Sequence, residues 1–394
     1  MSAPPHSLRG TPNMKVSCLQ ENLARGLNIV SRAVAPRSAT LPVLTHVLVA
    51  TDNGRLRIAA TNLELGIGCW IGAKVDEDGA ITVPARTLSD LVNLLSAGQL
   101  DLEGNTRAQS LHVQSGRTDA NIKGIDAAEF PIIPSFNAEG SVQVDPKTLK
   151  KLIDQVTFAA STDDSRPAMT GVFTRLDGDT ITMAATDGFR LSVCSGRLIE
   201  PVTEARSVLI PARAIAEVGR IIGDQQDPIA ISITPSHGQV LFHLKDVDVV
   251  AQLIDQKFPN YEFIIPKKYE TRAVVNTAEL LKACKQASIF ARDSADIVRL
   301  TISAGEAPEV AVAARADETG EDISRLGKED GVAEASGPTL EIGFNVRYLI
   351  DALGAMDKPQ VAIEASSPRS AGVIRPIGDD AFLHVLMPIN LPRL

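Results

Sequence analysis

Apolar and polar positions follow one plan along this chain, and the plan is used three times. In each copy, a short run with alternating apolar residues precedes apolar residues at positions i, i+4 and i+7. Alternation is typical of a strand, and the second spacing is typical of an amphipathic helix. Each copy therefore predicts a strand followed by a helix. The strands begin near Lys15, Ser141 and Arg272, and the helical stripes begin at Leu23, Leu149 and Leu280.

Two further marks recur at the same period. The dipeptides Phe130-Pro131, Phe258-Pro259 and Met387-Pro388 close the copies at spacings of 128 and 129 residues. Midway, a second helical pattern opens at Pro84, Pro211 and Asn345. A repeat of this length is a whole domain and not a solenoid unit.

Paired strands with explicit turns follow the first helix of each copy. Asp52-Asn53-Gly54 and Asp177-Gly178 lie between alternating runs, and such turns suit β-hairpins. Each third thus consists of two related halves, each a strand, a helix and several strands. We predict an α+β chain with six helices, at residues 22–33, 84–95, 146–158, 211–222, 278–292 and 345–356.

These patterns set the expected boundaries. Residues 1–13 are rich in Pro and Ser and are expected to form a disordered extension. Residues 317–337 are acidic and turn-rich and are expected to form a solvated, mobile loop. The predicted domains are 14–126, 141–254 with a connector at 255–271, and 272–394.

Charge is distributed unevenly between the helices and the rest of the chain. The net charge is −9, yet the six predicted helices together carry +7, so the remainder carries −16. Helices often collect Lys and Arg simply as solvated faces. The asymmetry points to a polyanionic partner only if all six helices face one place.

Bulk composition narrows the class of protein. With 44% apolar and 22% charged residues, the chain is typical of a soluble globular protein, and no apolar run reaches the length of a membrane helix. The four cysteines lie far apart without a CxxC motif. We therefore expect buried free thiols in a reducing cytoplasm and no membrane association.

Motifs for catalysis or cofactor binding are absent from the sequence. No P-loop or GxSxG motif occurs, and the six histidines are scattered without metal-ligand spacing. Thr186-Asp187 resembles a nucleophile beside a carboxylate, but Thr61-Asn62 occupies the matching place in the first repeat, which favours a strand-end turn. We expect no enzyme activity, no cofactor and no metal.

Five separate motifs carry a resemblance to a known family. They are Thr40-Leu41-Pro42-Val43-Leu44, Ala185-Thr186-Asp187-Gly188-Phe189-Arg190-Leu191, Phe258-Pro259-Asn260-Tyr261, Ile342-Gly343-Phe344-Asn345-Val346-Arg347-Tyr348 and Val385-Leu386-Met387-Pro388-Ile389. In order and spacing they closely resemble the bacterial DNA polymerase III β-subunit family of sliding clamps, over residues 14 to 394. The resemblance implies three tandem clamp domains and a head-to-tail homodimeric ring, with helices inside and sheets outside.

The resemblance also implies partners. The ring would encircle duplex DNA without reading its sequence and act as a processivity factor, in the cytoplasm at the nucleoid. Its partners would be the replicative polymerase, the clamp loader, and other polymerases and repair factors that carry short clamp-binding peptides. The residues expected to face DNA are Arg25, Arg32, Arg37, Lys147, Lys150, Lys151, Arg166, Arg213, Arg220, Lys282, Lys285 and Arg347.

A peptide pocket is carried over by motif in the same way. Its walls would be Met169, Thr186, Gly188, Phe189, Arg190, Leu191, Pro259, Phe263, Ile264, Asn345, Tyr348, Met387, Pro388 and Ile389. Methionine and aliphatic side chains make an adaptable groove for several partners. One alternative from another class stays open: a triplicated interaction scaffold that never meets DNA.

Overall fold

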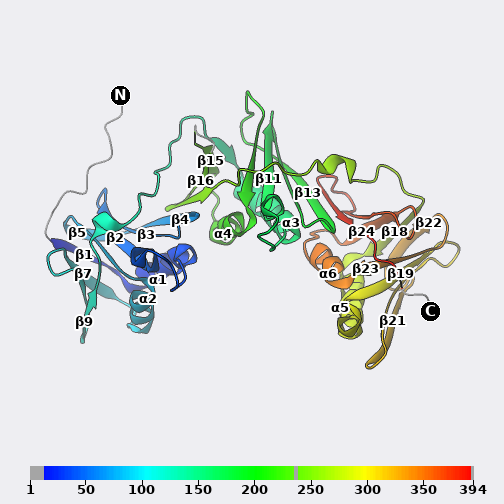
Figure 1. The fold of residues 1–394 in the computed structure, drawn as a ribbon, viewed down its shortest axis with the longest axis horizontal. Coiled ribbons are helices and arrows are strands. Elements are labelled where there is room, and N and C mark those ends of the chain that lie inside the picture. The colour runs from blue at the N-terminus through cyan, green and yellow to red at the C-terminus, as the bar shows by residue number, and fades with distance from the viewer. Residues whose placement is uncertain (1–12, 235–237, 392–394) are drawn as a thin grey trace. The chain divides into compact units, whose positions relative to one another are not determined.

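The computed structural model describes residues 13–234 and 238–391. They divide into two compact units. Figure 1 labels helices and strands of both. Unit 1 runs up to Pro146 and includes Arg220–Leu253, and unit 2 comprises Lys147–Gly219 and the chain from Ile254 onward. Apart from Asn13, the predicted extension 1–13 lies outside the described residues, and so does the end of the chain after Leu391.

Unit 1 contains two sheets. One has eight strands in the order β10-β15-β16-β17-β4-β3-β2-β6, and the other has five in the order β5-β1-β7-β8-β9. The strands are β1 Asn13–Leu19, β2 His46–Asp52, β3 Arg55–Thr61, β4 Leu65–Ile71, β5 Ala73–Glu77, β6 Ala80–Pro84, β7 Gln99–Asn105, β8 Ser110–Ser115, β9 Thr118–Lys123, β10 Val142–Val144, β15 Ile229–Ile233, β16 Gln239–Leu244 and β17 Val247–Gln252.

The helices of unit 1 are α1 (Gln20–Val30) and α2 (Ala85–Leu94). The predicted apolar stripe of α1 is buried, as its i, i+4, i+7 spacing requires. Gly26 lies in this stripe, and a Cβ there would lie 2.8 Å from Cδ1 of Ile58 on β3. The close approach of α1 to the sheet therefore depends on a residue without a side chain.

Unit 2 also contains two sheets. One has nine strands in the order β14-β11-β12-β13-β26-β25-β24-β18-β22, and the other has four in the order β21-β20-β19-β23. The strands are β11 Gly171–Asp177, β12 Thr180–Thr186, β13 Arg190–Arg197, β14 Arg206–Pro211, β18 Thr271–Asn276, β19 Ile297–Ser303, β20 Glu309–Ala316, β21 Gly320–Leu326, β22 Val332–Ser336, β23 Leu340–Asn345, β24 Gln360–Ala365, β25 Gly372–Pro376 and β26 Phe382–Leu386.

Unit 2 carries most of α3 (Pro146–Val156) and of α4 (Ala212–Ile222), with α5 (Thr277–Ala291) and α6 (Val346–Gly354). The side chains of Asn276 and Asn345 cap α5 and α6 by accepting backbone N–H groups of their first turns. Helices α5 and α6 bury their apolar faces in one core with β18, β19, β20, β23 and β24. The six predicted helices and the α+β class are thus confirmed.

The three repeats do not correspond one to one with the compact units. Strand β4 of the first repeat pairs with β17 of the second, and β13 of the second pairs with β26 of the third. Each large sheet therefore joins the first half of one repeat to the second half of the next. The backbone pairing across repeats decides where the compact units divide. The period in the sequence does not reveal this pairing.

The predicted solvated loop at 317–337 is wrong. Residues 320–326 form β21, which pairs with β20, and residues 332–336 form β22, which pairs with β18. Along β21, buried Leu326 and half-buried Asp322 and Ser324 alternate with exposed residues. The acidic residues thus lie on a strand, because charged side chains on the solvent face of a sheet do not prevent main-chain pairing.

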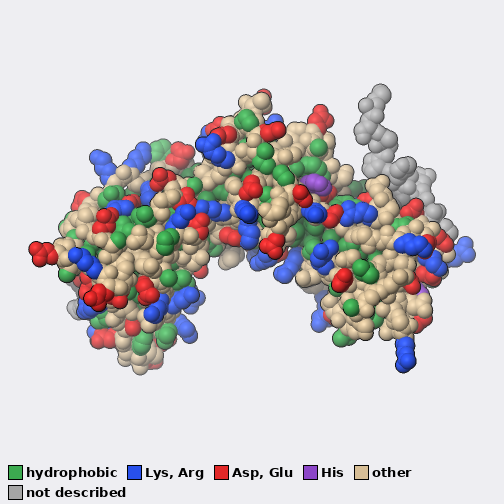
Figure 2. All heavy atoms as spheres, turned by 180° about the vertical axis from the view of Figure 1, so that it is seen from behind, with side chains coloured by type: hydrophobic (Ala, Val, Ile, Leu, Met, Phe, Trp, Pro, Cys, Tyr) green, Lys and Arg blue, Asp and Glu red, His purple; other side chains and the backbone are tan. Residues whose placement is uncertain are grey.

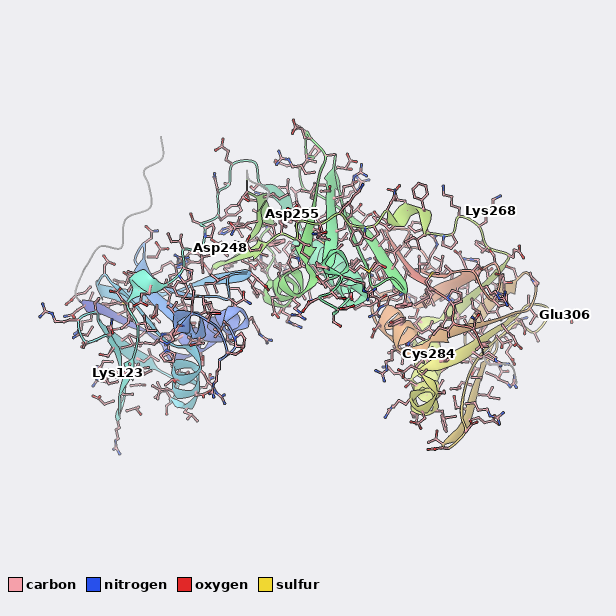
Figure 3. The ribbon with its side chains drawn as sticks, in the orientation of Figure 1. Lys123, Asp248, Asp255, Lys268, Cys284 and Glu306 are labelled. Atoms are coloured by element: carbon pink, nitrogen blue, oxygen red, sulfur yellow. The ribbon has the colours of Figure 1, made fainter. Side chains whose placement is uncertain are left out.

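Two predictions from composition can be compared with the described residues. Their four cysteines are free and buried, as predicted. Burial raises the pKa of the Cys284 thiol to about 12, so it stays protonated in the core of unit 2, where Figure 3 labels it. No helix in the described part of the chain has the length and apolarity needed to span a bilayer.

Candidate functional site

A tight turn between β12 and β13 forms the centre of the candidate site in unit 2. The Thr186 hydroxyl donates to the carbonyl of Arg190 at 2.6 Å and accepts the N–H of Gly188 at 3.1 Å. Asp187 Oδ1 accepts the N–H groups of Phe189 and Arg190 at 2.9 and 3.0 Å. Gly188 has a φ of +93°, which a residue without Cβ adopts readily. Both polar side chains therefore build the predicted strand-end turn.

Arg190 is held by contacts with two carboxylates. Its Nε donates to Asp187 Oδ2 at 3.1 Å and its Nη1 to Asp351 Oδ2 at 2.6 Å, and the side chain is only 10% exposed. The guanidinium also lies over the rings of Tyr348 and Phe158, at 4.3 and 5.5 Å from their centroids. A buried arginine in such a cage is rigid, because paired carboxylates and ring faces fix its plane.

Tyr348 and Asn345 come to this site from the start of α6. The Asn345 side chain accepts the N–H groups of Arg347 and Tyr348 and so fixes the first turn of the helix. Burial and the neighbouring Asp187 carboxylate raise the pKa of the Tyr348 hydroxyl above its ordinary value, so it remains a neutral hydroxyl at physiological pH.

The segment after β26 passes between the turn and β23. The N–H of Met387 donates to the carbonyl of Phe189 at 2.9 Å, and the N–H of Ile389 donates to the carbonyl of Gly343 at 2.8 Å. A Cβ on Gly343 would lie 2.5 Å from the Ile389 carbonyl oxygen, so this approach needs glycine. The segment thus holds Met387-Pro388-Ile389 beside the turn.

Apolar side chains are exposed around this frame. Phe189 is 59% exposed and Met387 is 42% exposed, although their backbones are hydrogen-bonded to each other. Neighbouring exposed apolar side chains form a patch of the kind that often marks an interaction site. Leu191, by contrast, is buried in a cluster with Ala184 and Phe258, so it supports the site from below.

The connector after β17 is anchored to unit 2 by aromatic side chains. Phe258 stacks on Phe173, and Tyr261 meets both rings edge-on, so this aromatic group anchors the connector to the sheet. Pro259 lies between them in sequence. Phe263 is 86% exposed, whereas Tyr261 and Ile265 pack on the cluster of Leu191. Phe258 and Tyr261, the two aromatic residues of the sequence motif, thus anchor the connector.

Arg166 and Met169 approach the turn from the preceding loop. Arg166 Nη1 donates to the Asp187 carbonyl at 3.0 Å and lies 3.4 Å from Met169 Sδ. Arg166, which the sequence analysis assigned to the DNA-facing set, thus contacts the turn between β12 and β13. Asp351 and Phe158 were missed, and no sequence signal links either of them to Arg190, which lies more than thirty residues away from both.

The other basic residues expected to face DNA lie mostly on helix surfaces. Lys151 is tied to Asp357 and Asp379 at 2.9 and 2.5 Å. Others make exposed pairs, as Lys150 does with Asp154. Among the described residues, six make no ion pair within 4 Å: Arg25, Arg32, Arg37, Lys147, Arg213 and Lys285. On the face drawn in Figure 2, basic and acidic side chains are interspersed.

Three family models match the chain in succession. The N-terminal domain of the DNA polymerase III β subunit matches residues 14–134, the central domain matches 143–260, and the C-terminal domain matches 262–390. Together they cover nearly all the described residues.

Individual relatives agree with the family models. The β sliding clamp of Synechococcus elongatus is 34% identical over 383 residues, covering 96% of this chain and 100% of the relative. That of Staphylococcus aureus is 29% identical, covering 92% and 96%. The crystal structure of the Bacillus subtilis sliding clamp matches with a TM-score of 0.90 at 26% identity, and covers 96% of this chain and 100% of that one. A Pseudomonas aeruginosa clamp bound to griselimycin matches with a TM-score of 0.87 at 28% identity over 96% and 100%.

Proposed function

This chain belongs to the DNA polymerase III β-subunit family, and from that premise we propose that it is a DNA sliding clamp. Two copies form a head-to-tail ring that encircles duplex DNA and tethers the replicative polymerase and other replication and repair factors. The clamp is an accessory subunit without catalysis of its own and works in the cytoplasm, at the nucleoid. In support of this, the polar side-chain atoms of Thr186 and Asp187 are hydrogen-bonded within the turn and to Arg190.

One observation supports ring closure above the others. Each large sheet joins the first half of one repeat to the second half of the next, at the pairs β4–β17 and β13–β26. The first half of the third repeat ends in β21, and the second half of the first repeat ends in β9; both are edge strands. By the same rule, β21 is expected to pair with β9. A second copy supplies that partner, because unpaired edges are templates for pairing with another chain.

Exposed apolar residues accompany the β21 edge. Ile323 on β21 is 50% exposed, and Ile289 on the neighbouring α5 is 58% exposed. In unit 1, edge strand β9 ends at Lys123, which Figure 3 labels. Ile323→Asp is expected to convert the dimer to a monomer in light scattering. Ile199→Asp, at a residue that is 49% exposed elsewhere in unit 2, is the matched control and leaves the dimer intact.

DNA contact is proposed for the helix cations. Lys and Arg neutralise phosphates without reading bases, which suits a ring that slides. Lys147 and Lys285 are exposed and free of ion pairs among the described residues, whereas Lys151 is already neutralised by two aspartates. Replacing Lys147, Lys282 and Lys285 with Ala is expected to lower DNA-dependent processivity, with no change in dimerisation. Unchanged processivity favours the interaction scaffold.

Partner docking is proposed for the surface around Phe189 and Met387. Both side chains are exposed beside the rigid Arg190 cage, so an apolar anchor of a short peptide gains burial at little ordering cost. Phe189→Ala with Met387→Ala is expected to weaken binding of a polymerase peptide in calorimetry, without opening the ring. Equal affinity contradicts the assignment.

The experiment that tests the function itself is topological. The protein is loaded onto nicked circular DNA with an ATP-driven clamp loader, freed of unbound protein by gel filtration in moderate salt, and the DNA is then linearised. Retention on the circle and loss from the linear form are expected for a ring that slides off ends. Equal retention on both forms indicates ordinary binding, and retention on neither form supports the scaffold.

A further inference from the structure

Unit 1 contains a small pocket at the turn between β3 and β4. Its volume is about 110 Å³, and its lining includes Leu63, Glu64, Ile132, Gln239 and Gln252. Ile132 is 96% exposed and Leu63 is 51% exposed. The space accommodates one aliphatic side chain, and an apolar hollow with a few polar groups at its edge is the usual form of a ligand site.

The backbone around this pocket repeats that of the candidate site in unit 2. The Thr61 hydroxyl donates to the Leu65 carbonyl and accepts the N–H of Leu63, as Thr186 does with Arg190 and Gly188. Asn62 Oδ1 accepts the N–H groups of Glu64 and Leu65 at 3.0 and 2.7 Å. The position of Gly188 is taken by Leu63, which also has a positive φ, of 78°.

The strand beside the turn is equivalent too. The N–H of Gln252 donates to the Glu64 carbonyl at 2.8 Å, as Met387 does to Phe189 at 2.9 Å. The connector residue Ile133 packs tightly on Gly66, where a Cβ would lie 3.3 Å from Ile133 Cγ2. The backbone of the turn and the packing of Ile133 on Gly66 therefore fix one side of the pocket.

The side chains at the two turns differ in charge and polarity. Glu64 stands where Phe189 stands, and Leu65 where the caged Arg190 stands. The exposed Glu64 carboxylate makes no ion pair within 4 Å among the residues that the structure describes. Gln239 and Gln252 add amide groups that can bond to an extended main chain. A carboxylate next to an apolar hole complements a cation next to an apolar anchor.

We propose that this pocket binds a short linear peptide of a partner protein, in which an aliphatic anchor stands next to a lysine or arginine. The anchor enters the hole between Leu63 and Ile132, and the cation pairs with Glu64. The site is separate from the surface around Phe189 and Met387 and selects the opposite charge, so one chain docks two chemically different peptides.

Titration calorimetry on the full chain tests this with two capped pentapeptides, Leu-Lys-Leu-Lys-Leu and Leu-Glu-Leu-Glu-Leu. The lysine peptide is expected to bind at one site per chain. Glu64→Lys and Ile132→Ser are each expected to weaken it by about tenfold or more, while Glu64→Asp and the pair Phe189→Ala, Met387→Ala change it by less than about twofold.

The outcomes are distinct. No saturable binding of the lysine peptide, or loss of binding in the unit 2 variant but not in the Glu64→Lys and Ile132→Ser variants, overturns the proposal. Equal affinity for both pentapeptides overturns the role of Glu64. Clamp loading of the Glu64→Lys variant is measured in parallel and is expected to be normal, so a failure of the clamp function is seen separately from a failure of this site.

Discussion

The turns at 61–65 and 186–190 share a backbone but differ in nearly every exposed side chain. Both use a threonine, an Asx residue and a positive φ at the third position. The strands that follow pair in the same register: Ile67 with Val249 in unit 1, and Ser192 with His384 in unit 2. The first is an apolar pair and the second a buried hydrogen bond of 2.7 Å. One frame thus supports two chemistries, because its geometry depends on main-chain bonds.

The largest expected effect comes from giving unit 2 the leucine of unit 1. Arg190→Leu leaves the carboxylates of Asp187 and Asp351 without their cation, so we expect the free energy of unfolding of unit 2 to fall by about 3 kcal/mol. Urea denaturation measures this. Adding Asp351→Leu should restore part of the loss, and a further loss of the same size would show that the pair does not matter.

The second prediction concerns acid sensitivity. His384 is fully buried, and burial lowers its pKa from 6.5 to about 3, so the folded state keeps it neutral while the unfolded chain takes a proton. The stabilisation that neutral His384 gives the folded state is complete above pH 6.5 and is lost as the pH falls toward 3. Between pH 6.5 and pH 4.5 unit 2 should lose roughly 2–3 kcal/mol through this group.

A variant that copies unit 1 provides the control for this prediction. Ser192→Ile with His384→Val replaces the buried hydrogen bond by the apolar pair of unit 1. Its stability should fall less over the same pH interval in thermal unfolding. Identical pH profiles for the variant and the natural chain would show that His384 is not the titrating group.

The third prediction exchanges the side chains of Phe189 and Glu64, which occupy equivalent positions in the two turns. Phe189→Glu gives unit 2 the carboxylate of unit 1 and removes about 2 kcal/mol of apolar burial from a bound peptide anchor. Affinity for an apolar, acidic peptide should fall by at least about tenfold. The matched change Glu64→Phe in unit 1 should leave that affinity unchanged, because Glu64 lies outside the unit 2 site.

The smallest effect concerns the third turn position. Leu63 holds a φ of 78° that costs an L-residue roughly 1 kcal/mol, whereas Gly188 holds +93° at little cost. Leu63→Gly should therefore raise the thermal stability of unit 1 slightly or leave it unchanged, since the lost apolar contact offsets the relieved strain. Gly188→Leu should lower that of unit 2.

Local patterns in the sequence determined much of this protein. The six helices and the hairpin turns follow from apolar spacing and from residues that accept a positive φ, both of which act over a few positions. The turn at Thr186 was predictable for the same reason, from its likeness to Thr61. The prediction of a loop at 317–337 was wrong, because the charged residues on the solvent face of β21 make its alternating burial difficult to recognise in the sequence.

Only the tertiary structure decided which residues from distant parts of the chain contact one another. Asp351 reaches Arg190 from a helix 161 residues away in the chain, and Phe258 and Tyr261 pack on Phe173 of β11. The pairing of β4 with β17 and of β13 with β26 is equally non-local. Local propensity acts through neighbours in sequence, whereas these contacts depend on which sheet edges meet, and that is settled by burial and main-chain pairing over the whole fold.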